Sequence, residues 1–161
     1  MYINYIGGVF MVRIVEYNAE YKQAVSDLIV SIFVDEYGFD CYREDCANAD
    51  YNKYKESKGN CWVALDPEGK VIGSIALEGK GLEEAYLKIM YVHNDYRGEG
   101  IAQKLYNVSY NFALENGFKR IFLGTYGRLG RAIAFYKKNG FIEYPHETYT
   151  FDDQYFYVDV V

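Results

Sequence analysis

Hydrophobic and polar positions follow two alternating periods along the chain, which separate predicted strands from predicted helices. Residues 12–16 alternate as in a strand, whereas apolar residues between 19 and 34 recur at helical spacing. Asn18 stands directly before that helix and is its expected N-cap. The polar, glycine-marked segment 35–45 predicts a loop, and residues 47–55 predict a second, short helix.

In the rest of the chain, segments with strand-like spacing of apolar residues again alternate with segments of helical spacing. Segments 61–66 and 71–79 flank a turn that contains Pro and Gly, which predicts a hairpin. The later predicted elements are a strand over 84–92, a helix over 101–116, a strand over 119–125, a helix over 131–139, and strands over 141–144 and 155–161. Gly117 and Gly140 are expected to end the two helices in a left-handed conformation. This order predicts one α+β domain over residues 1–161.

Length and composition agree with a single globular domain. The chain has 161 residues, of which 50% are apolar, 25% are charged and 2 are Pro, so disorder and low-complexity linkers are poor interpretations. A formal charge of −6 disfavours a nucleic-acid partner. The apolar start lacks a basic segment and is interrupted by Arg13, so neither a signal peptide nor a membrane span is predicted. Met11 could be the true start, with residues 1–11 an upstream extension.

Cysteine and tyrosine are the two residue types whose use needs an explanation. Cys41, Cys46 and Cys61 form no C-x-x-C pair, so we expect small buried side chains in a reducing, cytoplasmic protein without a metal. Tyrosine contributes 19 residues of an aromatic content of 19%. Because the phenol can donate, accept and titrate, the sequence poses the question of which tyrosines do chemistry and which only pack.

The segment from Arg97 to Ala102 lies between a strong predicted strand and a strong predicted helix. Gly98 and Gly100 allow a tight turn whose N–H groups point into one concavity, and the helix start adds its uncompensated N–H groups. Such a place binds phosphate, and the guanidinium of Arg97 suits a diphosphate. Neither the P-loop pattern nor the dinucleotide fingerprint is met, since Gln103 stands where a third glycine would be needed. An ordinary strand-to-helix turn is the alternative.

Two motifs in this half of the chain closely resemble those of the GNAT superfamily of acyl-CoA-dependent N-acetyltransferases. The family's [RQ]-x-x-G-x-[GA] loop is matched by Arg97, Gly100 and Ala102. Its later A-x-x-[FL]-Y-x-x-x-G-F motif is matched by the following residues: Ala132, Phe135, Tyr136, Gly140 and Phe141. The resemblance implies a three-layer α+β fold with a mixed central sheet, a splayed fourth strand and about four helices.

The resemblance also implies roles for individual residues. Acetyl-CoA would be the acyl donor, with its pantetheine arm paired to the backbone of Met90, Tyr91 and Val92. The Val92 N–H would stabilise the oxyanion. The cofactor site as a whole would comprise Met90, Tyr91, Val92, Arg97, Gly98, Glu99, Gly100, Ile101, Ala102, Phe135 and Tyr136. Tyr136 would be the general acid that protonates the leaving thiolate, unless it is simply a packed aromatic residue.

The sequence departs from the family pattern at three positions. Leu129 replaces an asparagine, and Tyr86 and Gly124 stand at the two places where relatives carry a catalytic glutamate. The general base is therefore open. Glu84 is the first candidate, because it shares a strand face with Tyr86. The other options are a chain of waters, an amine that is already partly neutral, or one of three further side chains: His93, Asp35 and Glu36.

The resemblance implies that segments 35–45 and 145–154 wall the acceptor pocket. Their acidic residues would favour a cationic amine, although acidic loops are usually just soluble; they are Asp35, Glu36, Asp40, Glu44, Asp45, Glu147, Asp152 and Asp153. Aromatic residues could also line the pocket: Tyr37, Phe39, Tyr42, Tyr149 and Phe151. The leading hypothesis is direct acetyl transfer to a primary amine, and the rival is a non-catalytic acyl-CoA-binding sensor or assembly module. The last strand could pair with a second copy at a sheet edge, giving a homodimer.

Overall fold

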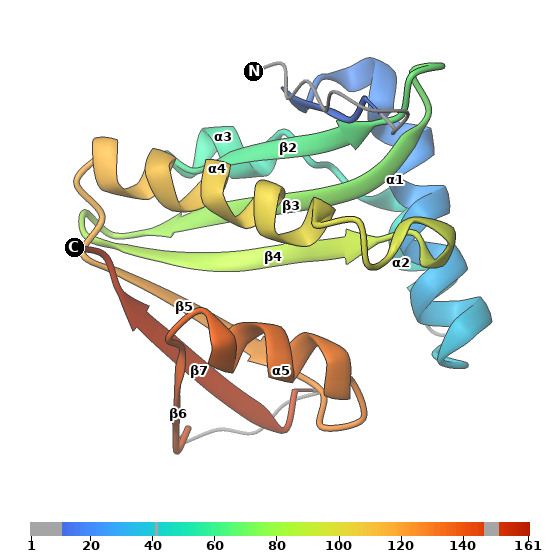
Figure 1. The fold of residues 1–161 in the computed structure, drawn as a ribbon. Helices are drawn as coiled ribbons and strands as arrows, with labels where there is room; N and C mark the ends of the chain where they lie inside the picture. The colour runs from blue at the N-terminus through green and yellow to red at the C-terminus, as the bar shows by residue number, and fades with distance from the viewer. Residues whose placement is uncertain (1–10, 41, 147–151) are drawn as a thin grey trace.

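The computed structural model describes residues 11–40, 42–146 and 152–161, and in these ranges a mixed seven-stranded sheet lies between two layers of helices (Figure 1). The strand order is β1-β2-β3-β4-β5-β7-β6. The strands are β1 (Arg13–Glu16), β2 (Asn60–Leu65), β3 (Val71–Lys80), β4 (Glu84–Val92), β5 (Arg120–Thr125), β6 (Ile142–Tyr144) and β7 (Gln154–Asp159). This is the three-layer α+β architecture that the sequence predicts.

The helices divide between the two faces of the sheet. They are the 3-10 helix η1 (Ala19–Tyr21), α1 (Lys22–Ile29), the π-helix η2 (Val30–Glu36), α2 (Tyr42–Asn48), α3 (Lys53–Glu56), the 3-10 helix η3 (Asn94–Tyr96), α4 (Ile101–Glu115) and α5 (Gly130–Lys138). Helices α4 and α5 cover one face, and the helices between β1 and β2 cover the other face. No helix in the described ranges combines the length and apolarity needed to cross a bilayer.

Most predicted helix ends are confirmed, and for the expected physical reasons. The side chain of Asn18 accepts a hydrogen bond from the Glu20 N–H at 2.9 Å and so caps η1. Gly117 follows α4 with φ 79°, and Gly140 follows α5 with φ 86°. Residues other than glycine rarely adopt these left-handed angles, so each glycine ends its helix where predicted.

The segment that follows the first helix differs from the prediction. Within the described chain the expected loop 35–45 is reduced to residues 37–40, because η2 continues through Glu36 and α2 already begins at Tyr42; Cys41 lies outside the described residues. The expected helix over 47–55 is instead two short helices, α2 and α3. Of residues 43–48 in α2, only Cys46 is buried, and the first turn carries acidic residues that favour a helix N-terminus. One buried position among these six leaves too weak a period to recognise in the sequence.

Each face of the sheet carries its own apolar cluster. The cluster under α4 and α5 includes Trp62, Leu105, Tyr136 and Phe156, and the cluster under α1 and η2 includes Phe33. Cys46 and Cys61 are buried free thiols, as predicted, and Cys41 lies outside the described residues. Burial raises the pKa of the Cys61 thiol to about 12, so this thiol is neutral and unreactive at physiological pH.

The feature that positions the functional site is the separation of β4 from β5. These parallel strands pair at Glu84–Arg120, Ala85–Ile121 and Tyr86–Phe122, and beyond Tyr86 they diverge (Figure 1). The pairing of β4 with β3 shifts register between Ser74 and Ala76, opposite Ile89, whose φ is 43°. This irregularity bends β4 away from β5, as β-bulges do. The splayed fourth strand is therefore confirmed.

The C-terminal strand does not lie at a sheet edge. Strand β7 pairs with β5 over residues 154–159, and its residues 155–157 also pair with β6 on the other side. The expectation that the last strand forms the edge of the sheet is therefore wrong, whereas a homodimer stays a prediction. The edge strands of the sheet are β1 and β6.

A close backbone approach at Gly59 provides a test of the packing between α3 and the sheet. A Cβ at this position would lie 1.7 Å from the Leu77 carbonyl oxygen. We expect Gly59→Ala to lower the free energy of unfolding by about 2–4 kcal/mol, because backbone atoms cannot rotate away from the added methyl group. Urea denaturation followed by circular dichroism measures the change.

Gly130→Ala is the matched control, since nothing lies within 4 Å of a Cβ there and Gly130 is the first residue of α5. Alanine has the higher helix propensity, so this variant should be as stable as the native chain or slightly more stable. Equal urea midpoints for the two variants would contradict the close approach at Gly59.

Candidate active site

The backbone of Val92 faces the opening between β4 and β5. His93 N–H donates to the Ile72 carbonyl of β3 at 2.8 Å, whereas the Val92 carbonyl accepts from Arg97 Nε at 3.2 Å on the other side. In an extended strand the N–H and C=O of one residue point to the same side, and neighbouring residues point to opposite sides. The Val92 N–H therefore points into the opening, where the predicted oxyanion donor is needed.

The loop after β4 has the geometry of an anion site. Gly98 and Gly100 have φ values of 85° and 77°, which turn the chain tightly before α4. Gly100 occupies the N-cap position of α4 and provides no side-chain hydrogen bond, so the first N–H groups of this fifteen-residue helix are uncapped. A phosphate group could accept hydrogen bonds from these groups and from the loop backbone.

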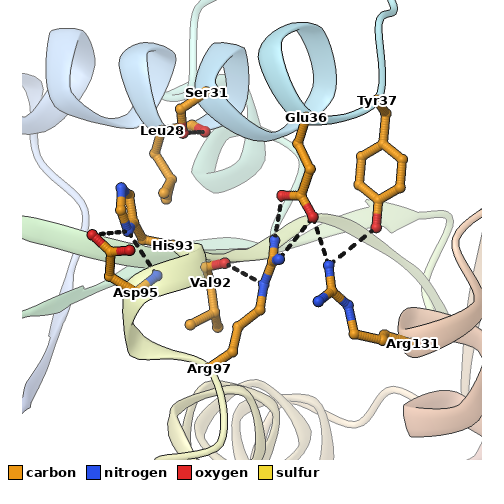
Figure 2. Close-up of polar contacts among 9 residues, drawn as sticks. All are labelled: Leu28, Ser31, Glu36, Tyr37, Val92, His93, Asp95, Arg97 and Arg131. Carbon is orange, nitrogen blue, oxygen red and sulfur yellow. Dashed lines mark hydrogen bonds and ion pairs between the residues drawn. The ribbon is translucent and has the colours of Figure 1, made fainter.

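Arg97 and Arg131 are held together by one carboxylate, that of Glu36 (Figure 2). Arg97 donates from both terminal nitrogens to the two Glu36 oxygens, each at 2.8 Å, and Arg131 donates to Glu36 Oε1 at 2.6 Å. The Tyr37 hydroxyl accepts from Arg131 at 3.4 Å. We call these four residues the Glu36 cluster. It connects the end of η2, the loop after β4 and the start of α5 across the opening.

The Glu36 cluster changes two expectations. The guanidinium of Arg97, predicted to face a diphosphate, is directed at Glu36 instead, so the loop N–H groups are left as the anion donors. The hydrogen bonds and charge of Arg97 lower the pKa of Glu36, against an opposing effect of burial. A carboxylate that is stabilised in its ionised form is a weak base, which disfavours Glu36 as the proton acceptor.

The predicted acidic wall is partly neutralised where it meets the opening. Glu36 faces two arginines, and Asp35 forms an exposed ion pair with Arg43 at 3.2 Å. Arg128 lies over the Phe39 ring, 5.6 Å from its centre. The local charge is therefore less negative than a count of carboxylates indicates. Of the proposed aromatic lining, Tyr149 and Phe151 fall outside the described residues.

Tyr136 lies on α5 in the apolar cluster beneath that helix. Its side chain is buried, with its ring centre 5.6 Å from that of Phe141 and 6.1 Å from that of Phe135. Burial raises the pKa of Tyr136 strongly, and the negative charge of Asp152 adds to the effect. The phenol is thus protonated at any working pH and can act as a hydrogen-bond donor.

Leu129, which stands where relatives carry asparagine, has a packing role. It occupies the N-cap position of α5 without a side-chain hydrogen bond, and it packs against the apolar cluster under α1 and η2. Leu129 thus makes an apolar contact between the start of α5 and the helices on the other face, where the asparagine of relatives would make a polar contact.

Glu84, the first sequence candidate for the base, is poorly placed. Glu84 is exposed at the start of β4, eight residues before Val92, which is about 26 Å along a strand. His93 Nδ1 accepts a hydrogen bond from the Asp95 N–H at 3.2 Å. Tyr86 stacks on Phe122, with ring centres 5.4 Å apart, and so continues an aromatic sheet face.

Asp152, which the sequence places in the acceptor wall, makes a contact that the sequence did not predict. Asp152 packs against Gly124, although 28 positions separate them in the chain. No local pattern could have indicated this contact, because it depends on how the segment before β7 returns to β5.

Among the described residues, His, Cys, Asp and Glu side chains form no group of three or more that could hold a metal ion.

Comparison with protein families gives a direct match. The model described as the acetyltransferase (GNAT) family matches residues 22–141. The N-acetylaspartate synthetase of Xenopus tropicalis is 38% identical over 90 residues, which cover 55% of this chain and 33% of that protein. The uncharacterized N-acetyltransferase YjgM of Escherichia coli K12 is 36% identical over 94 residues, covering 56% of each chain. The match thus spans about a third and about half of these two relatives.

Solved structures resemble the whole chain. A GNAT-family acetyltransferase from Staphylococcus aureus Mu50 superposes with a TM-score of 0.84 at 27% identity, covering 93% of this chain and 99% of that one. The PaiA N-acetyltransferase of Thermoplasma acidophilum, solved in complex with coenzyme A, superposes with a TM-score of 0.76 at 18% identity, covering 92% and 98%. The second similarity establishes a shared fold.

The Glu36 cluster predicts a stability difference that can be measured. We expect Glu36→Gln to lower the free energy of unfolding by about 1–2 kcal/mol, because the partly buried bidentate pair with Arg97 and the more exposed bond to Arg131 are both weakened. Asp35→Asn is the matched control, since its partner Arg43 is exposed and such pairs contribute about 0–1 kcal/mol. Urea unfolding at pH 7 compares the two variants.

The same substitution has a predictable pH dependence. Folding lowers the pKa of Glu36 below its ordinary 4.5, so its contribution is complete above about pH 4.5 and disappears as the pH falls through the lowered value. The stability difference between the native chain and Glu36→Gln should therefore shrink in acid. A difference that stays constant from pH 7 to pH 3 would contradict the ionic role of Glu36.

Proposed function

The chain belongs to the acetyltransferase (GNAT) family, and we propose that it transfers the acetyl group of acetyl-CoA directly to a primary amine. The observation that carries this proposal is the open edge of β4, which leads directly into the glycine loop and the uncapped start of α4. An extended amide-containing arm with a diphosphate at one end fits these two features in sequence. The strand edge takes the amides, and the loop takes the phosphates.

Three groups of residues would bind the donor. The backbone of Met90, Tyr91 and Val92 offers hydrogen bonds to the pantetheine arm, as a strand offers them to a neighbour. The N–H groups of Gly98 to Ala102 hold the diphosphate at the positive end of α4. Arg97 keeps this loop in place through its bonds to Val92 and Glu36.

Two residues would assist the chemistry. The Val92 N–H donates to the thioester oxygen as negative charge develops there, an effect worth about 3–4 kcal/mol for one such donor. Tyr136 donates a hydrogen bond to the departing sulfur. Because its pKa is raised, complete proton transfer to a thiolate is unfavourable, and Tyr136 stabilises the charge without losing its own proton.

The acceptor is the open part of the proposal. The relatives differ here: one is named for N-acetylaspartate, and another, of Schizosaccharomyces pombe, is the N-alpha-acetyltransferase 30. The compensated carboxylates around Glu36 weaken the expectation of a cationic amine. The amines to test therefore include an acidic amino acid and a peptide amino end as well as a polyamine.

Release of CoA thiol distinguishes the enzyme from a non-catalytic acyl-CoA sensor. We expect at least one of L-aspartate, spermidine and a peptide beginning with alanine to accelerate thiol release from acetyl-CoA. Tyr136→Phe should then reduce kcat about 10²-fold, because the hydrogen bond to the sulfur is lost. Tight CoA binding without acceleration by any amine would favour the sensor. Full activity of Tyr136→Phe would remove its assigned role.

The glycine loop makes its own prediction for donor binding. Gly100→Asp adds a negative charge and a strained left-handed residue at the proposed diphosphate site, so it should weaken CoA binding at least tenfold in calorimetry. Gly69→Asp is the matched control, because Gly69 is also left-handed with open space around it but lies in the β2–β3 turn. Equal CoA affinities for the two variants would overturn the assignment of the loop.

A further inference from the structure

At Gly124 of β5, the space that a side chain would take is occupied by Asp152 from the segment before β7. A Cβ built on Gly124 would lie 2.4 Å from Asp152 Oδ2 and 2.9 Å from its Cγ. Gly124 does not have a left-handed backbone, so its missing side chain is explained by the Asp152 carboxylate and not by conformation. Asp152 thus presents a carboxylate from the position that a residue of β5 would otherwise occupy.

This position lies where the strands separate. Gly124 is two residues beyond Phe122, which belongs to the last pair between β4 and β5. Side chains two apart on a strand face the same side, so position 124 shares the face of Phe122 and Tyr86. Lys88 is likewise two residues beyond Tyr86 on β4, and its positive charge lowers the pKa of Asp152. The carboxylate therefore stands beside the narrow end of the opening.

Several hydrogen bonds hold the segment that carries Asp152 against β5. The Asp153 N–H donates to the Thr125 carbonyl at 3.1 Å, and the Gly127 N–H donates to Asp153 Oδ1 at 2.7 Å. The Tyr155 hydroxyl donates to the Asp152 carbonyl at 3.3 Å. The Asp152 carbonyl and the backbone and side chain of Asp153 thus all form hydrogen bonds. Within the described chain, however, the Asp152 carboxylate forms no hydrogen bond or ion pair.

The surroundings of Asp152 make it a stronger base than an exposed aspartate. Burial raises its pKa, the neighbouring charge of Asp153 adds to this, and Lys88 opposes it. The charge of Asp152 in turn contributes to the raised pKa of Tyr136. A partly buried carboxylate that accepts no hydrogen bond from the described residues and a protonated phenol thus act on each other through their charges.

We propose that Asp152 is the general base that accepts a proton from the acceptor amine. This inference rests on the proposed acetyl transfer. One ammonium proton passes to an Asp152 carboxylate oxygen, directly or through one water, and the freed lone pair forms the bond from nitrogen to the thioester carbon. When the carbon–sulfur bond breaks, its electron pair stays on sulfur next to Tyr136. The remaining surplus proton on nitrogen leaves to this sulfur or to solvent, giving amide and CoA thiol.

The test uses the whole chain, acetyl-CoA and the fastest of the three amines named above. Asp152→Asn should lower kcat at saturating amine about 10²-fold while CoA affinity in calorimetry stays unchanged. In the native chain kcat should rise with pH through the pKa of Asp152, because a base works when deprotonated, and the variant should lose this rise. Asp159→Asn is the matched control, since it removes the same charge from the far end of β7, where Asp159 is exposed and pairs with Arg120.

A rescue experiment separates a catalytic role from a structural one. Asp152→Ala clears the space beside Gly124, so adding Gly124→Glu should return a carboxylate to the site and restore part of kcat. Gly124→Glu alone should be harmful, because its side chain collides with Asp152. Asp152→Asn with the kcat and pH profile of Asp159→Asn would overturn the inference while acetyl transfer stands. A native chain that acetylates none of the amines would overturn the proposed function itself.

Discussion

Strands β4 and β5 are hydrogen-bonded over three residue pairs and then separate, and the rest of the molecule is arranged around that separation. Backbone N–H and C=O groups inside a protein need partners, so an interior strand edge without a neighbouring strand is costly unless something else pairs with it. Arg97 satisfies the Val92 carbonyl from one side. The Val92 N–H points into the opening on the side away from β3.

Packing on the face covered by α1 and η2 spans the two separating strands. On one face, the ring of Phe39 lies 5.1 Å from that of Tyr126, and Phe33 lies 5.8 Å from Tyr91, so η2 and the turn after it contact both sides of the opening. Leu129 joins the same apolar cluster from the start of α5. The Glu36 cluster adds an ionic connection over this packing. The abundance of tyrosine and phenylalanine thus has a largely structural explanation, because aromatic rings bridge the gaps that the diverging strands leave.

The two carboxylates beside the opening, Glu36 and Asp152, have opposite environments. Glu36 is fully committed to arginines and is kept ionised, whereas Asp152 is partly buried beside Lys88 and holds its proton more readily. Two carboxylates of similar intrinsic acidity thereby acquire different properties from their neighbours. Gly124 makes the second environment possible, because any larger residue would exclude the Asp152 carboxylate.

The sequence by itself determined nearly all strands and helices, the glycine loop, the position of Tyr136 and the family, because these depend on local periodicity, on glycine conformation and on short motifs. It indicated a missing glutamate at Gly124 but not what fills its place, and it assigned the first part of α2 to the loop 35–45, because Cys46 is the one buried position among residues 43–48. Which charges meet was decided by the tertiary structure alone. Glu36 and Arg131 are 95 positions apart, and Asp152 reaches Gly124 only because β7 returns antiparallel to β5. Contacts between distant residues depend on how strands and helices stack in three dimensions, and no pattern along one segment carries that information.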